Sequence, residues 1–431
     1  MSTGRAPRAT AAVLLALTAV FGAGALTASP AAAQPLPDGT DSAVSWLAGR
    51  FVDGNHLETV FGEDSFPDQG LTADAVLAFA GADVAGDAAA AATTWLADPA
   101  NLAGYVGDGT AESYTGALAK LALVATVRGE DPADFGGVDL IARLQARQAA
   151  SGRYADLSAF GDFSNGITQA LAVLSLHRAG ADATAGAAYL AGQQCADGGF
   201  PLQLEQPACV SQADATGFAV QALLATGLTD EATAALDQLE AVQAPGGGFA
   251  DTGQAGSAPN ANSTALAAQA LRVGGRDEAA DAAVAFLESL QVDCSGAAAD
   301  RGAVRYDEAG GGDTQRATAQ ALLGLAGVGL ADLSADGDDP ATPSIDCAPP
   351  SSTTTTTPPT STTTSAAPTS GTSSAAPTTT SAAPVVPPPG GSLPVTGAAP
   401  LPFLAVGGLL LLAGLALVLL ARGRRLDAGQ P

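Results

Sequence analysis

The densest group of carboxylates in this chain is the string Asp-Gly-Asp-Asp at 336–339. A carboxyl group donates protons near neutral pH only when its surroundings raise its pKa, most often by burial. The string comes after the last long apolar segment of the globular region and runs into Pro340 and Pro343. We therefore expect a loop outside the folded core, with at most a weak Ca²⁺-contacting role, rather than a buried proton donor.

Histidine and cysteine, the usual zinc ligands, are scarce. The only histidines are His56 and His177, and neither has a cysteine and an aspartate at ligand spacing. We predict no metal site and assign no catalytic residue. The two tryptophans, Trp46 and Trp95, occupy matching positions 49 residues apart, so we interpret them as core packing rather than as platforms for sugar rings.

The first 33 residues have the layout of a secretory signal. Arg5 and Arg8 form a positive region, an apolar run covers 11–26, and alanines at 31–33 offer a cleavage site before Gln34. This order is typical of a signal peptide that is removed on export. We expect the mature chain to begin near Gln34.

A second targeting pattern lies near the other end of the chain. The string L-P-V-T-G at 393–397 precedes an apolar run at 401–421 and a basic tail at 422–431. A run of this length is enough for a transmembrane helix, and the arginines after it favour a cytoplasmic end. The alternative is an ordinary single-pass anchor that is never cut.

This pattern resembles the sorting signal of Gram-positive cell-wall proteins. The resemblance implies that sortase cuts after Thr396 and joins it to a peptidoglycan precursor, so that the protein is covalently anchored to the cell wall and membrane-anchored only before cleavage. The recognition residues would be Leu393, Pro394, Thr396 and Gly397.

Between these signals lie two regions of opposite character. Residues 348–392 are mostly Thr, Ser, Pro and Ala, a composition that cannot bury enough apolar surface to fold. At roughly 3.1 Å per residue in polyproline II, this linker could span about 140 Å. Residues 34–347 form the globular region, which is long for one ordinary core, so a repeat architecture is expected.

Leucines recur through the globular region at a period of about 48 residues. They are Leu47, Leu96, Leu144, Leu190, Leu239 and Leu287, with spacings of 49, 48, 46, 49 and 48. In three units a glutamine (Gln148, Gln194 or Gln243) opens the pattern Q-x3-G-x-aromatic, and a polar D/N-x-T signal follows later. We predict in each unit an outer helix, a glycine turn, and an inner helix capped by Asp or Asn, the inner helix having no charge in its middle. Six such hairpins, twelve helices, predict an all-α, closed α6/α6 toroid.

This repeat resembles that of squalene and terpene cyclases, protein prenyltransferase β-subunits and cobalamin carriers of the transcobalamin type. The resemblance implies the toroid, but its enzymatic motifs do not transfer. The zinc ligands of prenyltransferases are missing, the D-x-D-D string at 336–339 follows the last repeat, and the G-C-G-E-Q string of thioester proteins is absent. Cobalamin is suggested by the resemblance only; we predict no other cofactor.

The turns and the inner-helix starts should gather at one end of the toroid. Six helix N-termini would point there, with hydroxyl groups between them and acidic caps offsetting their dipoles. Either these residues only cap helices and hold turns, or they form the rim of a site for a polar, roughly neutral ligand. The candidate rim is Tyr154, Asp162, Ser164, Phe200, Asp214, Thr216, Phe249, Asn262, Thr264 and Asp313.

The four cysteines all lie in the globular region. An even number in an exported domain favours disulfides. Of three connectivities we favour Cys195–Cys209, which closes a short loop, together with Cys294–Cys347, which ties the tail to the last repeat.

Charge narrows the choice of function. The chain has 17 Lys and Arg against 43 Asp and Glu, a net charge of −26, which excludes nucleic acid as a partner. We predict a wall-anchored toroid that binds an unknown small molecule or protein and catalyses nothing. The alternatives are a terpene-cyclase- or prenyltransferase-like enzyme and a structural adhesin or spacer.

Overall fold

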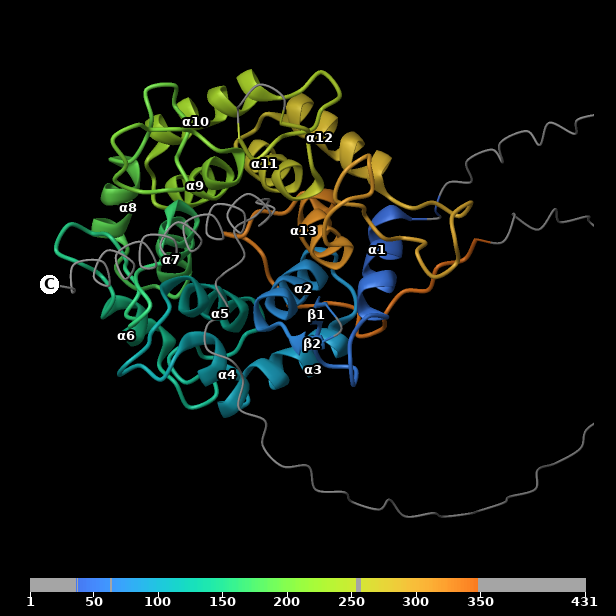
Figure 1. Ribbon diagram of the computed structural model, residues 1–431, viewed down its shortest axis with the longest axis horizontal. Coiled ribbons are helices and arrows are strands. Elements are labelled where there is room, and N and C mark those ends of the chain that lie inside the picture. Colours follow the sequence, from blue (N-terminus) through green and yellow to red (C-terminus); the bar gives the residue numbers. More distant parts are fainter. Residues whose placement is uncertain (1–35, 37, 63, 253–256, 348–431) are drawn as a thin grey trace, which may run out of the picture.

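Thirteen α-helices and one two-stranded antiparallel sheet form the described part of the chain in a computed structural model (Figure 1). The structure describes residues 36, 38–62, 64–252 and 257–347. The signal peptide, the linker, the sorting motif, the apolar run and the basic tail all lie outside these residues. Within them, no helix is both long and apolar enough to cross a membrane.

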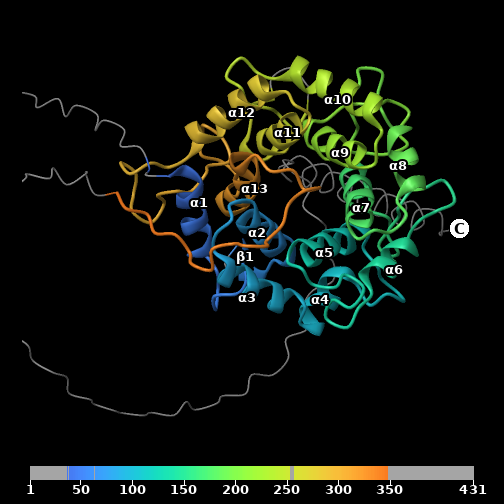
Figure 2. The same cartoon turned by 180° about the vertical axis from the view of Figure 1, so that it is seen from behind.

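Six helices form an inner ring, and each packs on the next one in chain order (Figures 1 and 2). The last of them also packs on the first, so the ring is closed. The inner helices are α2 (Gln69–Gly81), α5 (Thr115–Val127), α7 (Gly166–Arg178), α9 (Ala213–Ala225), α11 (Ala261–Val273) and α13 (Thr314–Ala326). They are buried over most of their surface because neighbouring helices cover both of their sides.

The remaining helices form an outer ring, and each carries one buried face and one exposed face. They are α1 (Gly39–Ala48), α3 (Gly86–Leu96), α4 (Pro99–Val106), α6 (Leu140–Gln145), α8 (Thr184–Ala191), α10 (Thr229–Val242) and α12 (Asp277–Leu290). All six repeat leucines lie on this ring and are at most 1% exposed. The predicted toroid is therefore confirmed for the described residues.

Two elements depart from the predicted twelve-helix plan. The second outer helix is divided into α3 and α4, because Asp98 caps a new helix that begins at Pro99, a residue that fits only the first turn of a helix. The first unit also carries the hairpin β1 (Glu58–Phe61) and β2 (Asp64–Pro67), which leads into α2.

The conserved spacing of the Q-x3-G pattern within this chain has a structural cause. The amide nitrogen of Gln243 donates to the carbonyl of Gly247 at 2.9 Å and to that of Ala279, in the first turn of the next outer helix, at 2.8 Å. Gly247 has a φ of 87°, and a Cβ there would lie 2.0 Å from the carbonyl oxygen of Ala282. Gln194 makes the same two contacts in its unit, so these glutamines tie the turn to the next repeat, and only glycine fits beside them. In the Gln148 unit the inner-helix residue Gln169 takes this role, and Gln148 donates to the Tyr154 hydroxyl instead.

The same contact closes the ring. The Gln291 side chain after α12 donates to the carbonyl of Gly39 in α1 at 2.7 Å, across 252 residues. The Trp46 ring nitrogen donates to the carbonyl of Ala299 at 3.0 Å, and the Arg50 guanidinium lies over the Trp46 ring. The first and last repeats are thus joined as neighbouring repeats are.

The segment that follows α13 runs across one end of the ring (orange in Figures 1 and 2). Arg178, at the end of α7, donates to the carbonyl of Leu330 at 2.6 Å, and the Ala335 amide donates to the carbonyl of Val127, at the end of α5, at 3.0 Å. Leu330 and Leu333 are buried. This tail closes the end of the ring at which the inner helices finish.

Both predicted disulfides are present. Cys195 is bonded to Cys209 in the loop between α8 and α9, and Cys294 is bonded to Cys347. The second bond fixes the far end of the tail beside the loop that follows α12.

Candidate functional site: a cavity at the centre of the ring

The three aromatic residues of the candidate rim are buried parts of the turns. Tyr154, Phe200 and Phe249 are each 1% exposed. The amides of Phe200 and Phe249 donate, both at 2.9 Å, to the hydroxyls of Thr216 and Thr264. These contacts give the two aromatics and the two threonines a role in holding the turns.

The polar rim residues differ from the predicted caps. Asp162 is not the cap of α7: it pairs with Arg153 at 2.7 Å and accepts from the amide of Ser164. Asp214 and Asn262 are buried in the first turns of α9 and α11 and are the second residues of these helices. The capping prediction is therefore wrong for both, and the cap of α11 is Asn260. Asp313 does cap α13.

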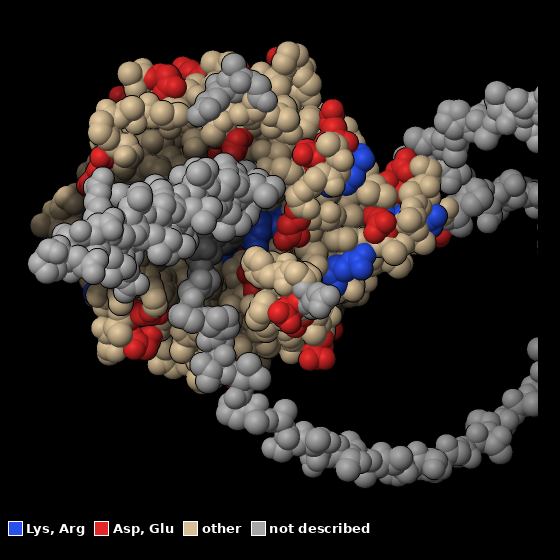
Figure 3. All heavy atoms as spheres, in the orientation of Figure 1, with Lys and Arg blue, Asp and Glu red and all other residues tan. Residues whose placement is uncertain are grey.

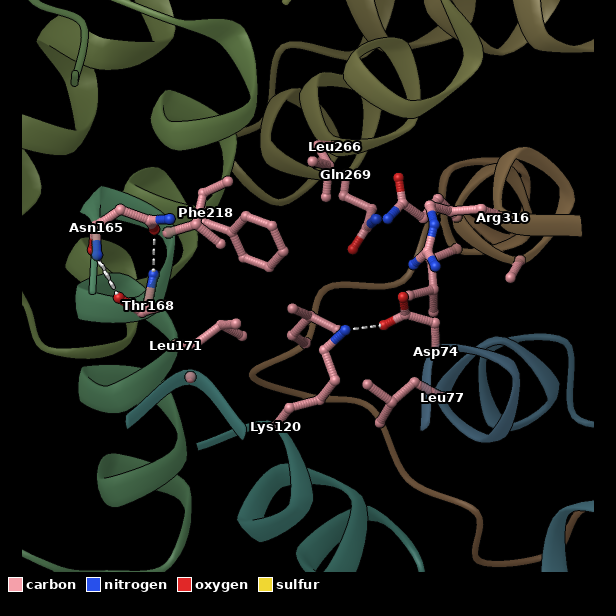
Figure 4. A pocket seen from close by; sticks show the side chains of 16 residues that line it. Asp74, Leu77, Lys120, Asn165, Thr168, Leu171, Phe218, Leu266, Gln269 and Arg316 are labelled. Atoms are coloured by element: carbon pink, nitrogen blue, oxygen red, sulfur yellow. Dashed lines mark hydrogen bonds and ion pairs between the residues drawn. The ribbon is translucent and has the colours of Figure 1, made fainter. Parts of the chain in front are cut away.

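A cavity of about 100 Å³ lies deeper, among the inner helices (Figure 4). None of the ten candidate rim residues lines it, and whether any of them contacts a ligand stays a prediction. The lining residues come from all six inner helices and from the tail. They are Asp74, Leu77, Gly116, Lys120, Asn165, Ile167, Thr168, Leu171, Phe218, Leu266, Gln269, Arg316, Ala319, Gln320, Leu323 and Leu330.

Equivalent positions in the six inner helices form much of the wall of this cavity. The sixth residue after the N-cap of each inner helix lines it, and these residues are Asp74, Lys120, Leu171, Phe218, Leu266 and Ala319. Because the six helices are equivalent in the ring, this position faces the axis in every one of them. At this position the wall is apolar on α7, α9, α11 and α13 and carries an ion pair between α2 and α5.

The charged side of the cavity contains two ion pairs. Lys120 pairs with Asp74 at 2.5 Å, and Arg316 pairs with Asp68, the N-cap of α2, at 2.8 Å. Burial alone would raise the pKa of Asp68, but the Arg316 guanidinium and the hydrogen bonds from the Thr59 hydroxyl and the Leu71 amide hold it below its ordinary value. The two pairs leave this side of the cavity without net charge. On the face seen in Figure 3, basic and acidic atoms lie side by side near the middle of the ring.

Several polar atoms at the cavity have no hydrogen-bond partner. Asp74 is 9% exposed, and its second carboxylate oxygen is buried and unpartnered. Gln269 is 1% exposed, and neither its amide oxygen nor its amide nitrogen has a partner. The Oε1 atom of Gln320 is also unpartnered. Buried polar groups are normally satisfied by protein, water or ligand, so these atoms are able to bond a molecule that enters the cavity.

The cavity is closed on one side and reached from the other. Leu330 of the tail lines it, and the Leu330 amide is held at 2.8 Å by the Gln221 side chain of α9. At the opposite side the lining reaches the first turns of inner helices, through Gly116, Asn165 and Arg316. The opening therefore lies at the inner-helix N-termini, the end that the sequence predicted for a ligand.

Exposed apolar side chains are found at this same end. Every large exposed hydrophobic residue of the described chain lies in, or next to, a segment that leads from an outer helix to an inner one. These are Val52, Val60, Phe61, Phe66, Phe160, Phe163, Val210 and Val242. Phe61 and Phe66 contact one another across the β1–β2 hairpin, with ring centroids 6.3 Å apart.

The acidic string at 336–339 lies in the tail and does not line the cavity. The expectation of an unburied loop is wrong for Asp338, whose side chain is 4% exposed and pairs with Arg128 at 3.4 Å. Burial raises the pKa of Asp338, although Arg128 opposes this. The string is therefore part of the closure of the ring and not a group of converging carboxylates.

The isolated histidine and the tryptophans serve packing. His56 stacks on Trp95 with ring centroids 4.6 Å apart, and Trp46 is 9% exposed. No group of three potential metal ligands is found among the residues that the structure describes.

Sequence reasoning missed Asp74, Lys120, Arg316 and Gln269. It described the inner helices as uncharged in the middle, which is wrong for α2 and α5. A signal was present: Lys120 is the only lysine of the chain, in an otherwise apolar segment. Aligning the repeats on their inner-helix starts would have placed it level with Asp74 and Phe218.

The fold and the central cavity define an α/α toroid of six helical hairpins. No protein-family model matches the chain, and no curated protein sequence matches it. Among solved structures, a protein from Actinoplanes has 16% identity and a TM-score of 0.50, covering 67% of this chain and 97% of that one.

Two enzymes show the same degree of likeness. An unsaturated glucuronyl hydrolase specific for heparin has 14% identity and a TM-score of 0.51, covering 67% of this chain and 95% of its own. A type II terpene cyclase from Scytonema, in complex with merosterolic acid A, has 14% identity and a TM-score of 0.50, with the same coverages. At this identity the comparison establishes the toroid fold and no activity.

Proposed function

We propose that this chain is a cell-surface binding protein, anchored to the wall by sortase, whose ring presents its central cavity to a small ligand. The anchoring is supported by the order of L-P-V-T-G, apolar run and basic tail at 393–431, together with the N-terminal signal pattern. The Thr/Ser/Pro linker would carry the ring outward from the anchor.

The observation that carries the binding role is the unsatisfied polar lining of a cavity with one open end. Asp74 and Gln269 keep buried polar atoms without partners beside an apolar wall that includes Phe218. Such atoms cost folding free energy, roughly 1–3 kcal/mol each, unless something satisfies them. A bound ligand with matching groups would recover that cost. The apolar lining, which includes Leu171 and Phe218, would add contact area for a partly apolar ligand.

The enzymatic alternative has less support. Acid–base chemistry of the glycosidase kind requires two carboxyl groups that flank the reacting bond. Only one carboxylate, Asp74, lines the cavity, and Lys120 neutralises it. Carbocation chemistry would favour several aromatic rings, and Phe218 is the only one in the lining. The spacer alternative is disfavoured because side chains do not fill the centre of the ring.

Cobalamin, suggested by resemblance, does not fit these residues. A cavity of about 100 Å³ is smaller than the roughly 150 Å³ cavity that admits benzene. A corrin ring is far larger than either, so no part of the proposed function uses it.

The binding role is tested by native mass spectrometry of the full chain isolated from a host with the same envelope type. An added mass that disappears on denaturation supports binding and gives the mass of the ligand. A bare mass after incubation with an extract of the host's own medium and envelope contradicts it.

The anchoring is tested separately by digesting the cell wall and sequencing the C-terminal peptide of the released protein. We expect the peptide to end at Thr396 with a peptidoglycan fragment attached, and the Thr396→Ala variant to stay in the membrane fraction. A released chain that still contains residues after Thr396 would show that sortase does not process it.

A further inference from the structure

The cavity described above has a specific chemical pattern, which restricts the ligand beyond what the proposed function requires. Resting on that function, we infer that the cavity recognises the hydroxyl-bearing end of an uncharged, otherwise apolar molecule, such as a phenol or a cyclic alcohol.

Charge is the first restriction. The two cations that line the cavity, Lys120 and Arg316, are already paired with Asp74 and Asp68. A further charge on the ligand would have to leave water without a free counter-charge to meet it, which is costly in a buried site. The group that enters is therefore neutral.

Hydrogen bonding is the second restriction. The free carboxylate oxygen of Asp74 only accepts, so the ligand must donate to it. The Gln269 amide has both an unpartnered donor and an unpartnered acceptor. A hydroxyl group both donates and accepts, so it can satisfy one atom of each side chain, whereas an ether or a ketone cannot donate. Figure 4 shows Asp74, Lys120 and Gln269 pointing toward one another from three different helices.

The apolar wall is the third restriction. Leu171 and Phe218 stand on the side of the cavity away from Asp74, and Leu266 lies beside Gln269 (Figure 4). These side chains offer no hydrogen bond, and the polar lining residues Asn165 and Thr168 bond to each other in the cap of α7. The body of the ligand is therefore hydrocarbon on that side. A volume of about 100 Å³ is below the roughly 150 Å³ of a cavity that encloses benzene, so the cavity holds the hydroxyl-bearing end of the ligand and not a whole substituted ring. The rest of the ligand must extend through the opening at the inner-helix N-termini.

Three probes of one shape separate these restrictions. They are 4-fluorophenol, 4-fluorotoluene and 4-fluorobenzoate, which differ in carrying a hydroxyl, a methyl or a carboxylate group. Their dissociation constants for the full chain are measured by fluorine NMR titration. We expect the phenol to bind at least about tenfold more tightly than the toluene, as one or two buried hydrogen bonds would give, and the benzoate to bind most weakly.

Two cavity variants and one control locate the effect. Gln269→Leu should bring the phenol and toluene affinities to within about twofold of each other, while Phe218→Trp should fill the cavity and abolish binding of all three probes. Gln238→Leu is the control, because Gln238 is a buried glutamine of α10 with an unpartnered Oε1 atom but does not line the cavity. This variant should keep the tenfold preference for the phenol.

Each result has a distinct meaning. Equal binding of phenol and toluene to the unaltered chain, with loss of both in Phe218→Trp, would overturn the hydroxyl inference and leave the proposed binding cavity standing. Tightest binding of the benzoate would overturn the claim of a neutral head. Binding that persists in Phe218→Trp, or no binding of any probe, would overturn the inference, and the native mass measurement would then decide the proposed function independently.

Discussion

Two buried glutamines on inner helices have opposite hydrogen-bond states, and replacing each with leucine should change stability in opposite directions. Gln169 of α7 receives a hydrogen bond from the Tyr154 amide at 2.9 Å. It donates to the carbonyls of Gly152 and Gly186 at 3.1 and 3.0 Å. Gln269 of α11 makes none of these contacts, since both of its polar atoms are unpartnered.

The expected magnitudes follow from the number of groups left without a partner. Gln169→Leu leaves two buried backbone groups, the Tyr154 amide and the Gly152 carbonyl, without a partner at about 1–3 kcal/mol each, so we expect a loss of roughly 2–6 kcal/mol. The Gly186 carbonyl lies inside α8 and keeps its helical hydrogen bond. Gln269→Leu strands none and removes two unsatisfied atoms at nearly constant volume, so we expect a gain of about 1–2 kcal/mol. The two variants should therefore differ by about 5 kcal/mol.

The assay is urea unfolding followed by circular dichroism, with each protein refolded from denaturant so that any bound small molecule is removed. The midpoint should move down for Gln169→Leu and up for Gln269→Leu, while the slope stays unchanged. A loss of more than about 1 kcal/mol in Gln269→Leu would refute the reasoning, because it would mean that Gln269 has hydrogen-bond partners in the ligand-free ring.

Further predictions concern the disulfides, pH and one turn. A double variant in which serine replaces both Cys294 and Cys347 should lose about 4 kcal/mol of stability in the chain-entropy model. The matching variant of Cys195 and Cys209 should lose about 3 kcal/mol, because that disulfide closes a shorter loop. Equal unfolding midpoints of both double variants and the unaltered chain would contradict this. Since the pKa of Asp68 is held below its ordinary value, its contribution is full above about pH 4 and is lost as pH falls through the folded-state pKa. Asp68→Asn, which can still cap α2, should therefore be less stable than the unaltered chain at pH 7 in urea unfolding, with the gap shrinking toward pH 2; a constant gap would count against the ion pair. Gly247→Ala should lower stability by roughly 3 kcal/mol or more, because its Cβ would lie 2.0 Å from the Ala282 carbonyl oxygen. Gly227 also has a positive φ but has open space around it, so Gly227→Ala should lower stability by only about 1–2 kcal/mol. Similar losses in calorimetry would show that backbone strain, and not the close contact, decides.

The ring could be predicted from the sequence because its cause is repeated several times. Each repeat leucine, turn glycine and bridging glutamine performs one local task at one period, so their spacing alone reports the hairpins. The pairing of Cys195 with Cys209 could be predicted for a similar reason, as both lie in one short loop.

The cavity could not be predicted in this way, because it depends on where the repeats differ. Asp74, Lys120 and Phe218 share a register but not a residue type, and their meaning appears only when six helices bring them to one axis. The tail was misjudged for a related reason. Nothing local indicates that Leu330 and Asp338 meet helix ends far earlier in the chain. Leu330 contacts Arg178, 152 residues away, and Asp338 contacts Arg128, 210 residues away. Asp214 was misread because a cap and a first-turn carboxylate have the same sequence signature.

The contacts between the first and last repeats also determine the order in which the ring can fold. Asp68 meets Arg316 across 248 residues, and Trp46 meets Ala299 across 253. Contacts of such high sequence separation form late, after local hairpins have assembled. For a chain made from its N-terminus, α1 to α12 form an open arc whose two ends expose the flanks of α2 and α11 until α13 arrives to sit between them. A chain that stops short of Thr314 lacks the helix that closes the ring, so the apolar flanks of α2 and α11 stay exposed. Exposed apolar surfaces of this kind promote aggregation.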